Sequence, residues 1–428
     1  MTVTISRLVR RAFLFFLFLF FFAFSLSETS ARAEGAAVSN GSIPDNLPPE
    51  VSEQYLDQLQ NSVSLFPYNE PLRKKLAQAY DNVGQRRIKQ KQFDEAAESF
   101  ARAHELFPAR LDYGIWRGIA LYRGKRYDEA AYEFESDRSA GGDNPPLLLY
   151  LGLVHYDTGN LAGALDAWDR ALALDPANKT ICDLAEKARR ESAVESRMEK
   201  GYRSMFEISY DEGSQSDLAD GVLKALESAY NRVGADLFLY PSVRTPVILY
   251  TRKDYRNLTA SPEWSGGLYD GKIRLPIGGA AEITPMLRGV LFHEYTHVVV
   301  RELTRGNCPS WLNEGLAEVE GRKEYDLPLT ALEGAAKTGA FLPFASLEKS
   351  LASLNGNDAL LAYQQGYAMV RFMISAYGWH KVREILVNLG SGMTIEAAIA
   401  KTFADYALDY QGLVQEWQAQ ALKEYGGR

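Results

Sequence analysis

A recurrence at a spacing of 34 residues constrains what the first half of this 428-residue chain can fold into. Between residue 51 and about residue 200, small residues and large aromatic residues return at this interval. The recurring positions are Ala96, Ala130 and Ala164, then Phe100, Phe134 and Trp168, and the pair Gly118 and Gly152. Small residues let paired helices approach closely, and an aromatic side chain fills the space between them. The period therefore predicts a stack of helical hairpins.

This register resembles that of the tetratricopeptide repeat. The last unit matches the repeat pattern at five positions, which are Gly152, Ala164, Trp168, Ala171 and Pro176. In the first unit, Leu76, Ala77 and Tyr80 stand too early, which indicates a longer helix or an insertion at residues 84–92. Residues 179–200 are expected to form a closing or connecting helix. We expect the array to bind a partner protein or a substrate in its groove.

The N-terminus has the layout of a secretory signal peptide, which would occupy residues 1–33. Three arginines precede an apolar run over residues 12–26, and the small-x-small sequence Ala31-Arg32-Ala33 follows. Because the run is short for a membrane span, we expect an exported protein, periplasmic or secreted, and an uncleaved membrane anchor is the alternative. Residues 34–50 contain Ser, Asn, Gly and three prolines, and they are expected to form a flexible linker.

Charge and cysteine content argue against some functions. The formal net charge is -8, and an acidic chain with no basic run beyond its N-terminus is a poor binder of nucleic acid. The two cysteines, Cys182 and Cys308, form no C-x-x-C sequence, so neither a thiol redox motif nor a cysteine zinc site is expected. They lie in different predicted domains, and whether they pair in an oxidising compartment stays open.

The chemistry of the second half is predicted from the run His293-Glu294-Tyr295-Thr296-His297, which lies in an apolar segment. Thr284 is the expected N-cap of a helix here, and Pro285 its first residue. On a helix, His293 and His297 stand one turn apart on one face, which is the spacing that two imidazoles need to bind one zinc ion. The alternative is a core helix with two hydrogen-bonded histidines. The other histidines, expected to be structural or surface residues, are His104, His155 and His380.

A second segment offers a third ligand, because W-L-N-E-G-L-A follows at residues 311–317. Together with H-E-x-x-H, it resembles the zinc signature of gluzincin metallopeptidases, including the aminopeptidase and leukotriene-hydrolase family. The resemblance implies one zinc ion per chain, with Glu314 as the third ligand and Glu294 as the general base. It also implies that Glu318 hydrogen-bonds a ligand histidine; the alternative is a solvated carboxylate. Ser310 is the expected cap of this second helix, with Glu314 in the first turn.

The match supports zinc hydrolysis and not aminopeptidase specificity. Those aminopeptidases hold the free amine of the substrate with a G-x-M-E-N segment, which residues 266–277 do not contain. Residues 272–277 instead predict a half-buried strand, which Pro276 places at a sheet edge. In the resembled fold, the edge strand beside the zinc helix binds extended substrate backbone. The substrate-binding residues are then expected to be Gly267, Leu268 and Tyr269.

The rest of residues 201–428 predicts a mixed domain that is largely helical towards its end. Strands are expected at residues 205–210 and 246–250, an amphipathic helix at residues 217–233, and a further helix at residues 359–376. In that last helix, the segment beginning at Tyr363 resembles the Y-x-K-G segment of the leukotriene-hydrolase-like family. The resemblance implies that Tyr363 stabilises the tetrahedral oxyanion; a packing role is the alternative.

The expected fold class is mostly α, with a tetratricopeptide array over residues 51–200 and an α+β, zincin-like gluzincin domain over residues 201–428. The whole chain most resembles bacterial proteins with a peptidase-MA-like domain. The expected function is that of a zinc metallopeptidase acting on an exported or envelope protein. The alternatives are a non-catalytic scaffold with a structural zinc domain, and a zinc hydrolase of non-peptide amides or esters.

Overall fold

The computed structural model describes residues 51–211, 216–259, 266–277, 280, 282–349, 351, 354 and 356–427. The signal peptide and linker expected in residues 1–50 lie outside these ranges. The chain divides between residues 193 and 194 into two compact units. Among the described residues, no helix is both long and apolar enough to cross a membrane. A helical repeat array followed by a domain with a small mixed sheet confirms the expected fold class.

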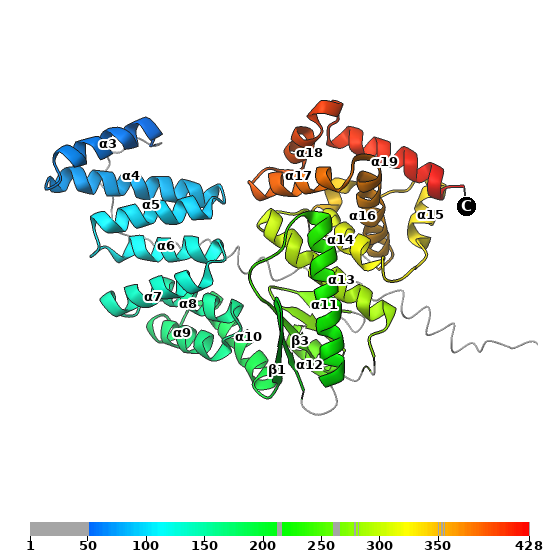
Figure 1. Ribbon diagram of the computed structural model, residues 1–428, viewed down its shortest axis with the longest axis horizontal. Coiled ribbons are helices and arrows are strands. Elements are labelled where there is room, and N and C mark those ends of the chain that lie inside the picture. The colour runs from blue at the N-terminus through cyan, green and yellow to red at the C-terminus, as the bar shows by residue number, and fades with distance from the viewer. Residues whose placement is uncertain are drawn as a thin grey trace, which may run out of the picture. The chain divides into compact units, whose positions relative to one another are not determined.

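The described part of the first unit consists of helices, and consecutive helices pack against one another (Figure 1). Two turn-linked helices form each repeat, and a last helix closes the array. The helices are α3 (Glu53–Leu65), α4 (Glu70–Lys89), α5 (Phe93–Leu106), α6 (Leu111–Arg123), α7 (Tyr127–Gly141), α8 (Pro145–Asp157), α9 (Leu161–Leu174) and α10 (Lys179–Glu195).

A glycine in the first helix of each pair receives the aromatic side chain of the second helix. A Cβ atom on Gly118 would lie 2.5 Å from the ring of Phe134, so only glycine lets α6 and α7 approach this closely. In the first pair, a Cβ atom on Gly84 would lie 2.7 Å from the ring of Phe100. Because α4 is unbroken, the expected longer helix is correct and the alternative insertion is wrong.

The connecting helix is shorter than the sequence predicts. α10 ends at Glu195, and residues 199–203 form the strand β1 (Glu199–Arg203) where a helix to residue 200 is expected. β1 pairs antiparallel with β2 (Phe206–Tyr210) along its whole length. Pairing with the next strand of the chain, in a hairpin, therefore overrides the local helical pattern, which is a weak determinant by itself.

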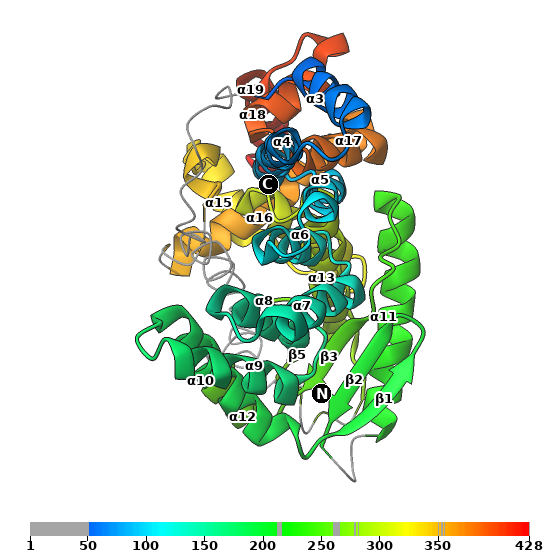
Figure 2. The same ribbon diagram turned by 90° about the vertical axis from the view of Figure 1, so that its left-hand side faces the viewer.

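The second unit contains a five-stranded sheet in the order β1-β2-β3-β5-β4. Figure 2 shows β1, β2, β3 and β5 side by side. β2, β3 (Thr245–Leu249) and β5 (Ile273–Leu275) are parallel, while β1 and β4 (Leu268–Tyr269) join the two edges antiparallel. α11 (Ser216–Leu237) connects β2 to β3 and packs on β2, as a crossover between parallel strands must. α12 (Arg252–Thr259) follows β3.

The edge strand is not the one that the sequence predicts. Pro276 suggests an edge at residues 272–277, but β5 lies between β3 and β4, and Pro276 follows its last residue. The basic side chain of Arg274 is fully buried instead of half exposed. Its Nε lies 3.1 Å from Asp270 Oδ1 and its Nη1 lies 3.3 Å from Glu195 Oε1, so the buried charge is paired. β4 forms the edge of the described sheet on this side.

Helices complete the second unit around α13 (Pro285–Thr304), which contacts α11, α14 and α17. Thr284 caps α13 as predicted, because its hydroxyl oxygen accepts the Leu287 backbone N–H at 3.1 Å. Pro285 is the first helical residue, also as predicted. The other helices are α14 (Ser310–Gly321), α15 (Thr330–Thr338), α16 (Gly356–Tyr377), α17 (Trp379–Gly390), α18 (Ile395–Thr402) and α19 (Tyr410–Tyr425).

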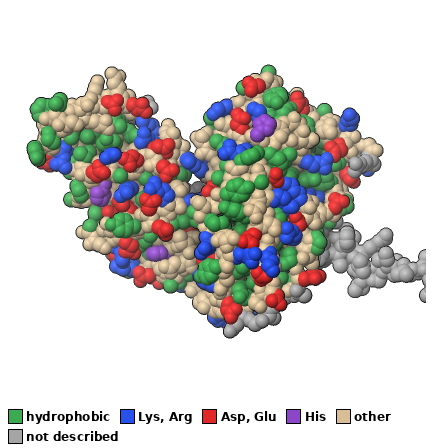
Figure 3. All heavy atoms as spheres, in the orientation of Figure 1, with side chains coloured by type: hydrophobic (Ala, Val, Ile, Leu, Met, Phe, Trp, Pro, Cys, Tyr) green, Lys and Arg blue, Asp and Glu red, His purple; other side chains and the backbone are tan. Residues whose placement is uncertain are grey.

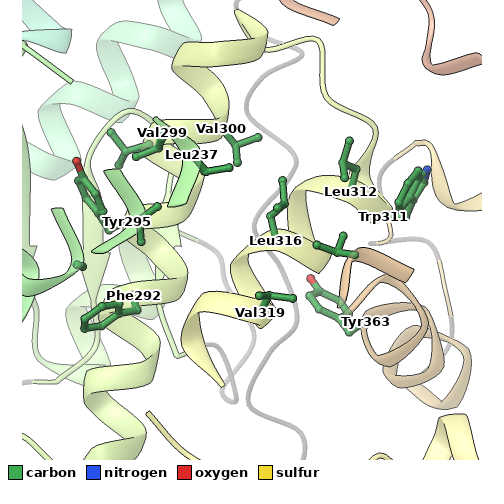
Figure 4. Packing of buried hydrophobic residues seen from close by; sticks show 14 of the residues in the cluster. Leu237, Phe292, Tyr295, Val299, Val300, Trp311, Leu312, Leu316, Val319 and Tyr363 are labelled. Atoms are coloured by element: carbon green, nitrogen blue, oxygen red, sulfur yellow. The ribbon is translucent and has the colours of Figure 1, made fainter. Parts of the chain in front are cut away.

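The helices α14 and α16 cross almost in backbone contact. A Cβ atom on Gly315 would lie 2.5 Å from the carbonyl oxygen of Gly366. Glycine at both positions therefore permits the crossing. It brings Tyr363, one turn before Gly366, next to α14 (Figure 4).

On the face of each unit that Figure 3 shows, charged side chains of both signs are interspersed. Both cysteines are free thiols: Cys182 lies on α10, and Cys308 lies just before α14.

Candidate metal centre

Three side chains from two helices converge in the core of the second unit. His293 and His297 stand one turn apart on α13, with ring centroids 4.8 Å apart, and Glu314 faces them from α14. Glu314 Oε2 lies 3.4 Å from His293 Nε2 and 3.7 Å from His297 Nε2. All three side chains are buried. Apolar residues of α13 and α14 belong to the core beside them, so the three side chains are largely removed from bulk water.

Asn313 determines which nitrogen of His297 faces this group. Asn313 Oδ1 lies 3.0 Å from His297 Nδ1, and an amide oxygen can only accept a hydrogen bond. Nδ1 therefore carries the proton, and Nε2 presents its lone pair toward Glu314. No role for Asn313 is predicted from the sequence. Its one sequence signal was its place beside Glu314 in the W-L-N-E-G run.

Glu318 lies behind His293, but the expected hydrogen bond between them is not formed, because the two groups are too far apart. Glu318 Oε1 is 3.6 Å from His293 Nδ1, and Glu318 Oε2 accepts a hydrogen bond from Arg322 Nε at 2.6 Å. Because Glu318 is only 3% exposed, the alternative of a solvated carboxylate is wrong. Arg322 holds the carboxylate in place and partly neutralises it, a contact that the sequence did not suggest.

Burial and mutual charge shift the pKa values in this cluster. Burial raises the pKa of Glu294 to about 7. For His293 burial acts to lower the pKa, but the neighbouring Glu314, Glu294 and Glu318 outweigh it and raise the pKa. Burial lowers the pKa of His297. Burial acts to raise the pKa of Glu314, but the two imidazoles outweigh it and lower it. Three carboxyl groups, those of Glu294, Glu314 and Glu318, thus lie close together out of water, and a bound cation would offset their mutual repulsion.

The donor atoms fit a zinc ion. One atom from each of His293, His297 and Glu314 lies within 4.8 Å of the other two. His297 Nε2 and Glu314 Oε2 are buried and have no hydrogen-bond partner in the described chain, which is costly for polar atoms. Two imidazole nitrogens and one carboxylate oxygen form a known ligand set of catalytic zinc, which keeps its fourth position open.

Glu294 lies against the residue that precedes β4. A Cβ atom on Gly267 would stand 2.7 Å from Glu294 Oε1 and 3.0 Å from its Cδ, so a side chain here would displace the carboxyl group. Glu294 Oε2 is buried and is not hydrogen-bonded to any described residue. The Glu294 carboxyl group and the Gly267 backbone at the sheet edge therefore lie on the same side of the cluster formed by His293, His297 and Glu314.

The expected substrate-binding residues form this sheet edge. Leu268 and Tyr269 pair with β5, and β4 packs on α13. The Leu268 side chain is buried in a small apolar cluster, while the Tyr269 ring lies 5.8 Å from the Arg301 guanidinium. Both side chains of β4 are thus engaged within the domain, and an additional strand would pair with the β4 backbone.

Tyr363 is buried on α16 and its ring faces α14 (Figure 4). Burial, followed by the charges of Glu314, Glu318 and Glu294, raises its pKa well above the ordinary value. The phenol therefore stays un-ionised and can donate a hydrogen bond. It also packs in the apolar core, so the structure accommodates both the packing role and the oxyanion role.

The start of α14 differs from the prediction by one residue. Pro309 is the N-cap and Ser310 is the first helical residue, so Ser310 does not cap the helix with its side chain. Its backbone N–H instead donates to the carbonyl oxygen of Glu348 at 3.0 Å. Glu314 consequently lies in the second turn and not in the first.

Comparisons with known proteins cover both units. A family model of the Peptidase MA superfamily matches residues 241–423, and tetratricopeptide-repeat models match residues 84–145 and 145–178. No curated protein matches the chain.

Two solved structures resemble the repeats. The Arabidopsis OM64 TPR domain is 20% identical, with 28% of this chain and 98% of that chain covered and a TM-score of 0.27. The first TPR of Spaghetti (RPAP3), bound to an HSP90 peptide, is 19% identical, with 28% and 95% covered and a TM-score of 0.27. At these values we infer nothing about function from either structure. The family matches, however, give the domain content of the chain, which carries a Peptidase MA superfamily domain preceded by tetratricopeptide repeats.

Proposed function

We propose that this protein is a zinc-dependent metallopeptidase that hydrolyses peptide bonds. The observation that carries the proposal is the convergence of His293, His297 and Glu314 beside the buried carboxyl group of Glu294. Structural zinc sites are closed by four protein ligands and need no base. Three protein donors with an adjacent acid favour a catalytic site.

The residues divide the chemistry among them. His293, His297 and Glu314 would hold the zinc ion, which when bound supplies a Lewis acid that activates water and polarises a carbonyl group. Glu294 accepts the proton of the attacking water and passes it to the leaving amine. Burial raises its pKa to about 7, which suits a group that must both take up and release a proton. The Tyr363 phenol donates a hydrogen bond to the oxygen of the substrate carbonyl as negative charge develops there.

The substrate would bind as an extended strand along β4. Its backbone would pair with β4 at Leu268 and Tyr269, the edge of the sheet as far as the structure describes it, and Gly267 would let it approach Glu294 closely. The apolar run and small-x-small sequence within residues 1–33 support a substrate outside the cytoplasm. The tetratricopeptide repeats would bind a protein partner or the substrate itself.

The first experiment measures zinc per chain in the purified full-length protein by elemental mass spectrometry. Glu314→Gln is expected to contain about one zinc ion less per chain than the wild type. Glu320→Gln is the matched control, because Glu320 is also buried on α14 but lies outside the donor set. Wild-type protein without zinc would refute the proposal. Equal zinc in wild type and Glu314→Gln would mean that the third ligand is wrong, and Glu318 would be tested next.

The second experiment measures cleavage of a mixed peptide library by mass spectrometry. Glu294→Gln is expected to retain zinc and to lose about 10²–10⁴-fold in cleavage rate, the usual contribution of a general base. Cleavage at the wild-type rate in this variant would contradict the assigned base. A wild-type protein that holds zinc and cleaves no peptide would favour a scaffold with a structural zinc domain.

A further inference from the structure

Two buried carboxyl groups interrupt the repeat pattern in the first unit. Glu133 and Asp137 lie one turn apart on α7, and they are 7% and 3% exposed. The positions 34 residues earlier and later are equally buried but hold small residues without charge. These residues are Ser99 and Ala103 before, and Ala167 and Ala171 after. Packing alone therefore does not require a carboxyl group at either position.

The facing helix is adapted to Asp137. A Cβ atom on Gly114 of α6 would lie only 2.3 Å from Asp137 Oδ2. The residues 34 positions away from Gly114 are large, namely Tyr80 and Leu148. The acid and the glycine thus depart from the repeat together, which indicates a built arrangement and not an isolated change.

His104 completes the cluster from the last turn of α5. One ring nitrogen of His104 and one oxygen each of Glu133 and Asp137 all lie within 4.8 Å of one another. His104 Nδ1 and Asp137 Oδ2 are buried and find no hydrogen-bond partner within the residues that the structure describes. Such atoms are rare in folded proteins and usually belong to a site for water, an ion or a ligand.

The charge of the cluster is only partly compensated. Arg117 Nη1 lies 2.6 Å from Glu133 Oε2, and this ion pair neutralises one carboxylate. No described Lys or Arg forms an ion pair with Asp137. Burial, followed by the charge of Glu133, raises the pKa of Asp137 to about 7. A cation between the three side chains would remove this electrostatic penalty.

We propose that His104, Glu133 and Asp137 bind a divalent transition-metal ion inside the repeat array. One imidazole nitrogen with two carboxylate oxygens suits zinc or manganese, whereas calcium and magnesium prefer sites made of oxygen alone. The ion ties α5 to α7 across α6. Repeat arrays are stabilised mainly by contacts between neighbours, and about three repeats are the minimum for stability. A metal link between two repeats stabilises such a short array.

The test uses the full chain with His293→Ala and His297→Ala, which remove two ligands of the candidate metal centre. After equilibration with zinc and removal of loosely bound metal, this background is expected to retain about one zinc ion per chain. Asp137→Ala in the background should reduce the zinc content to near zero. This change installs the residue of the neighbouring repeats, so circular dichroism should show unchanged helix content. Asp128→Ala, at an exposed position of α7, is the matched control and should retain the zinc.

Thermal unfolding gives a second readout. Zinc should raise the Tm of the background protein, because a ligand that binds only the folded state stabilises it. The same addition should leave the Asp137→Ala protein unshifted, and His104→Ala should behave likewise. A background protein that binds no zinc overturns the proposal. Zinc that persists in both Asp137→Ala and His104→Ala overturns it too, and would leave Asp137 as a protonated carboxyl group.

Discussion

Replacing Asn313 with alanine tests whether the orientation of His297 governs metal affinity. Asn313 Oδ1 accepts the His297 Nδ1–H at 3.0 Å, and both side chains are buried. Without the amide, Nδ1–H has lost this acceptor in a dry site, and the ring can rotate or take the other tautomer. Loss of such a partner weakens metal binding about 10–100-fold, which corresponds to about 1.4–2.7 kcal/mol. The cost of an unsatisfied buried donor, about 1–3 kcal/mol, has the same size.

Competition with a chromophoric chelator measures the zinc Kd of Asn313→Ala and of its parent. Both carry Asp137→Ala, so that the first unit contributes no zinc. Asn313→Asp should bind zinc at least as tightly as the parent, because its carboxylate also accepts the Nδ1–H. Asn307→Ala is the control: it removes an amide that donates to Leu389 and Met393 carbonyl oxygens at 2.8 and 2.9 Å, away from the donor set. It should lower stability and leave the Kd unchanged. An unchanged Kd in Asn313→Ala would refute the reasoning.

Two further predictions follow from buried contacts in the second unit. Gly267→Ala should slow cleavage of the peptide library about 10²-fold without loss of zinc, because the new Cβ would displace the Glu294 carboxyl group. The control is Gly334→Ala, where the Cβ meets nothing within 4 Å. Cleavage at the wild-type rate in Gly267→Ala would contradict the placement of Glu294 against Gly267. Burial raises the pKa of Glu320 from 4.5 to about 6, so its folded-state pKa exceeds that of the unfolded chain. The wild type should therefore lose about 2 kcal/mol relative to Glu320→Gln as the pH rises from about 3.5 to about 7, most steeply between the two pKa values, as measured by denaturant unfolding; a difference that does not vary with pH would disprove this.

Elements with local signals were predictable from the sequence. Thr284 and Pro285 mark the start of α13 because an N-cap and a first-turn proline act within one turn of the chain. The 34-residue period predicts the repeat helices because each glycine–aromatic contact joins helices that are adjacent in the chain. In the same way, the spacing of His293 and His297 predicts their common face on α13.

Features that depend on distant contacts were not predictable in the same way. β4 and β5 comprise two and three residues, which is too short for a periodic pattern. Their order in the sheet depends on the pairing of β5 with β3 and of β4 with β5. Arg274 suggested a half-exposed strand, yet Glu195 and Asp270 pair with it and allow its full burial. The role of Asn313 likewise appears only when α14 is packed on α13.

The cluster around Asp137 shows which sequence signal a repeat protein offers beyond its shared positions. The prediction that His104 is structural used only residues that the repeats have in common. Ala103 and Ala171 show that a small apolar residue can occupy this place on equivalent helices, where Tyr80 and Leu148 stand at the position of Gly114. Packing alone does not require a carboxyl group there, and the glycine at position 114 is the change in the facing helix that makes room for it. Departures that occur in pairs across two facing helices are stronger evidence of a site than either residue alone, because chance changes have no reason to be complementary.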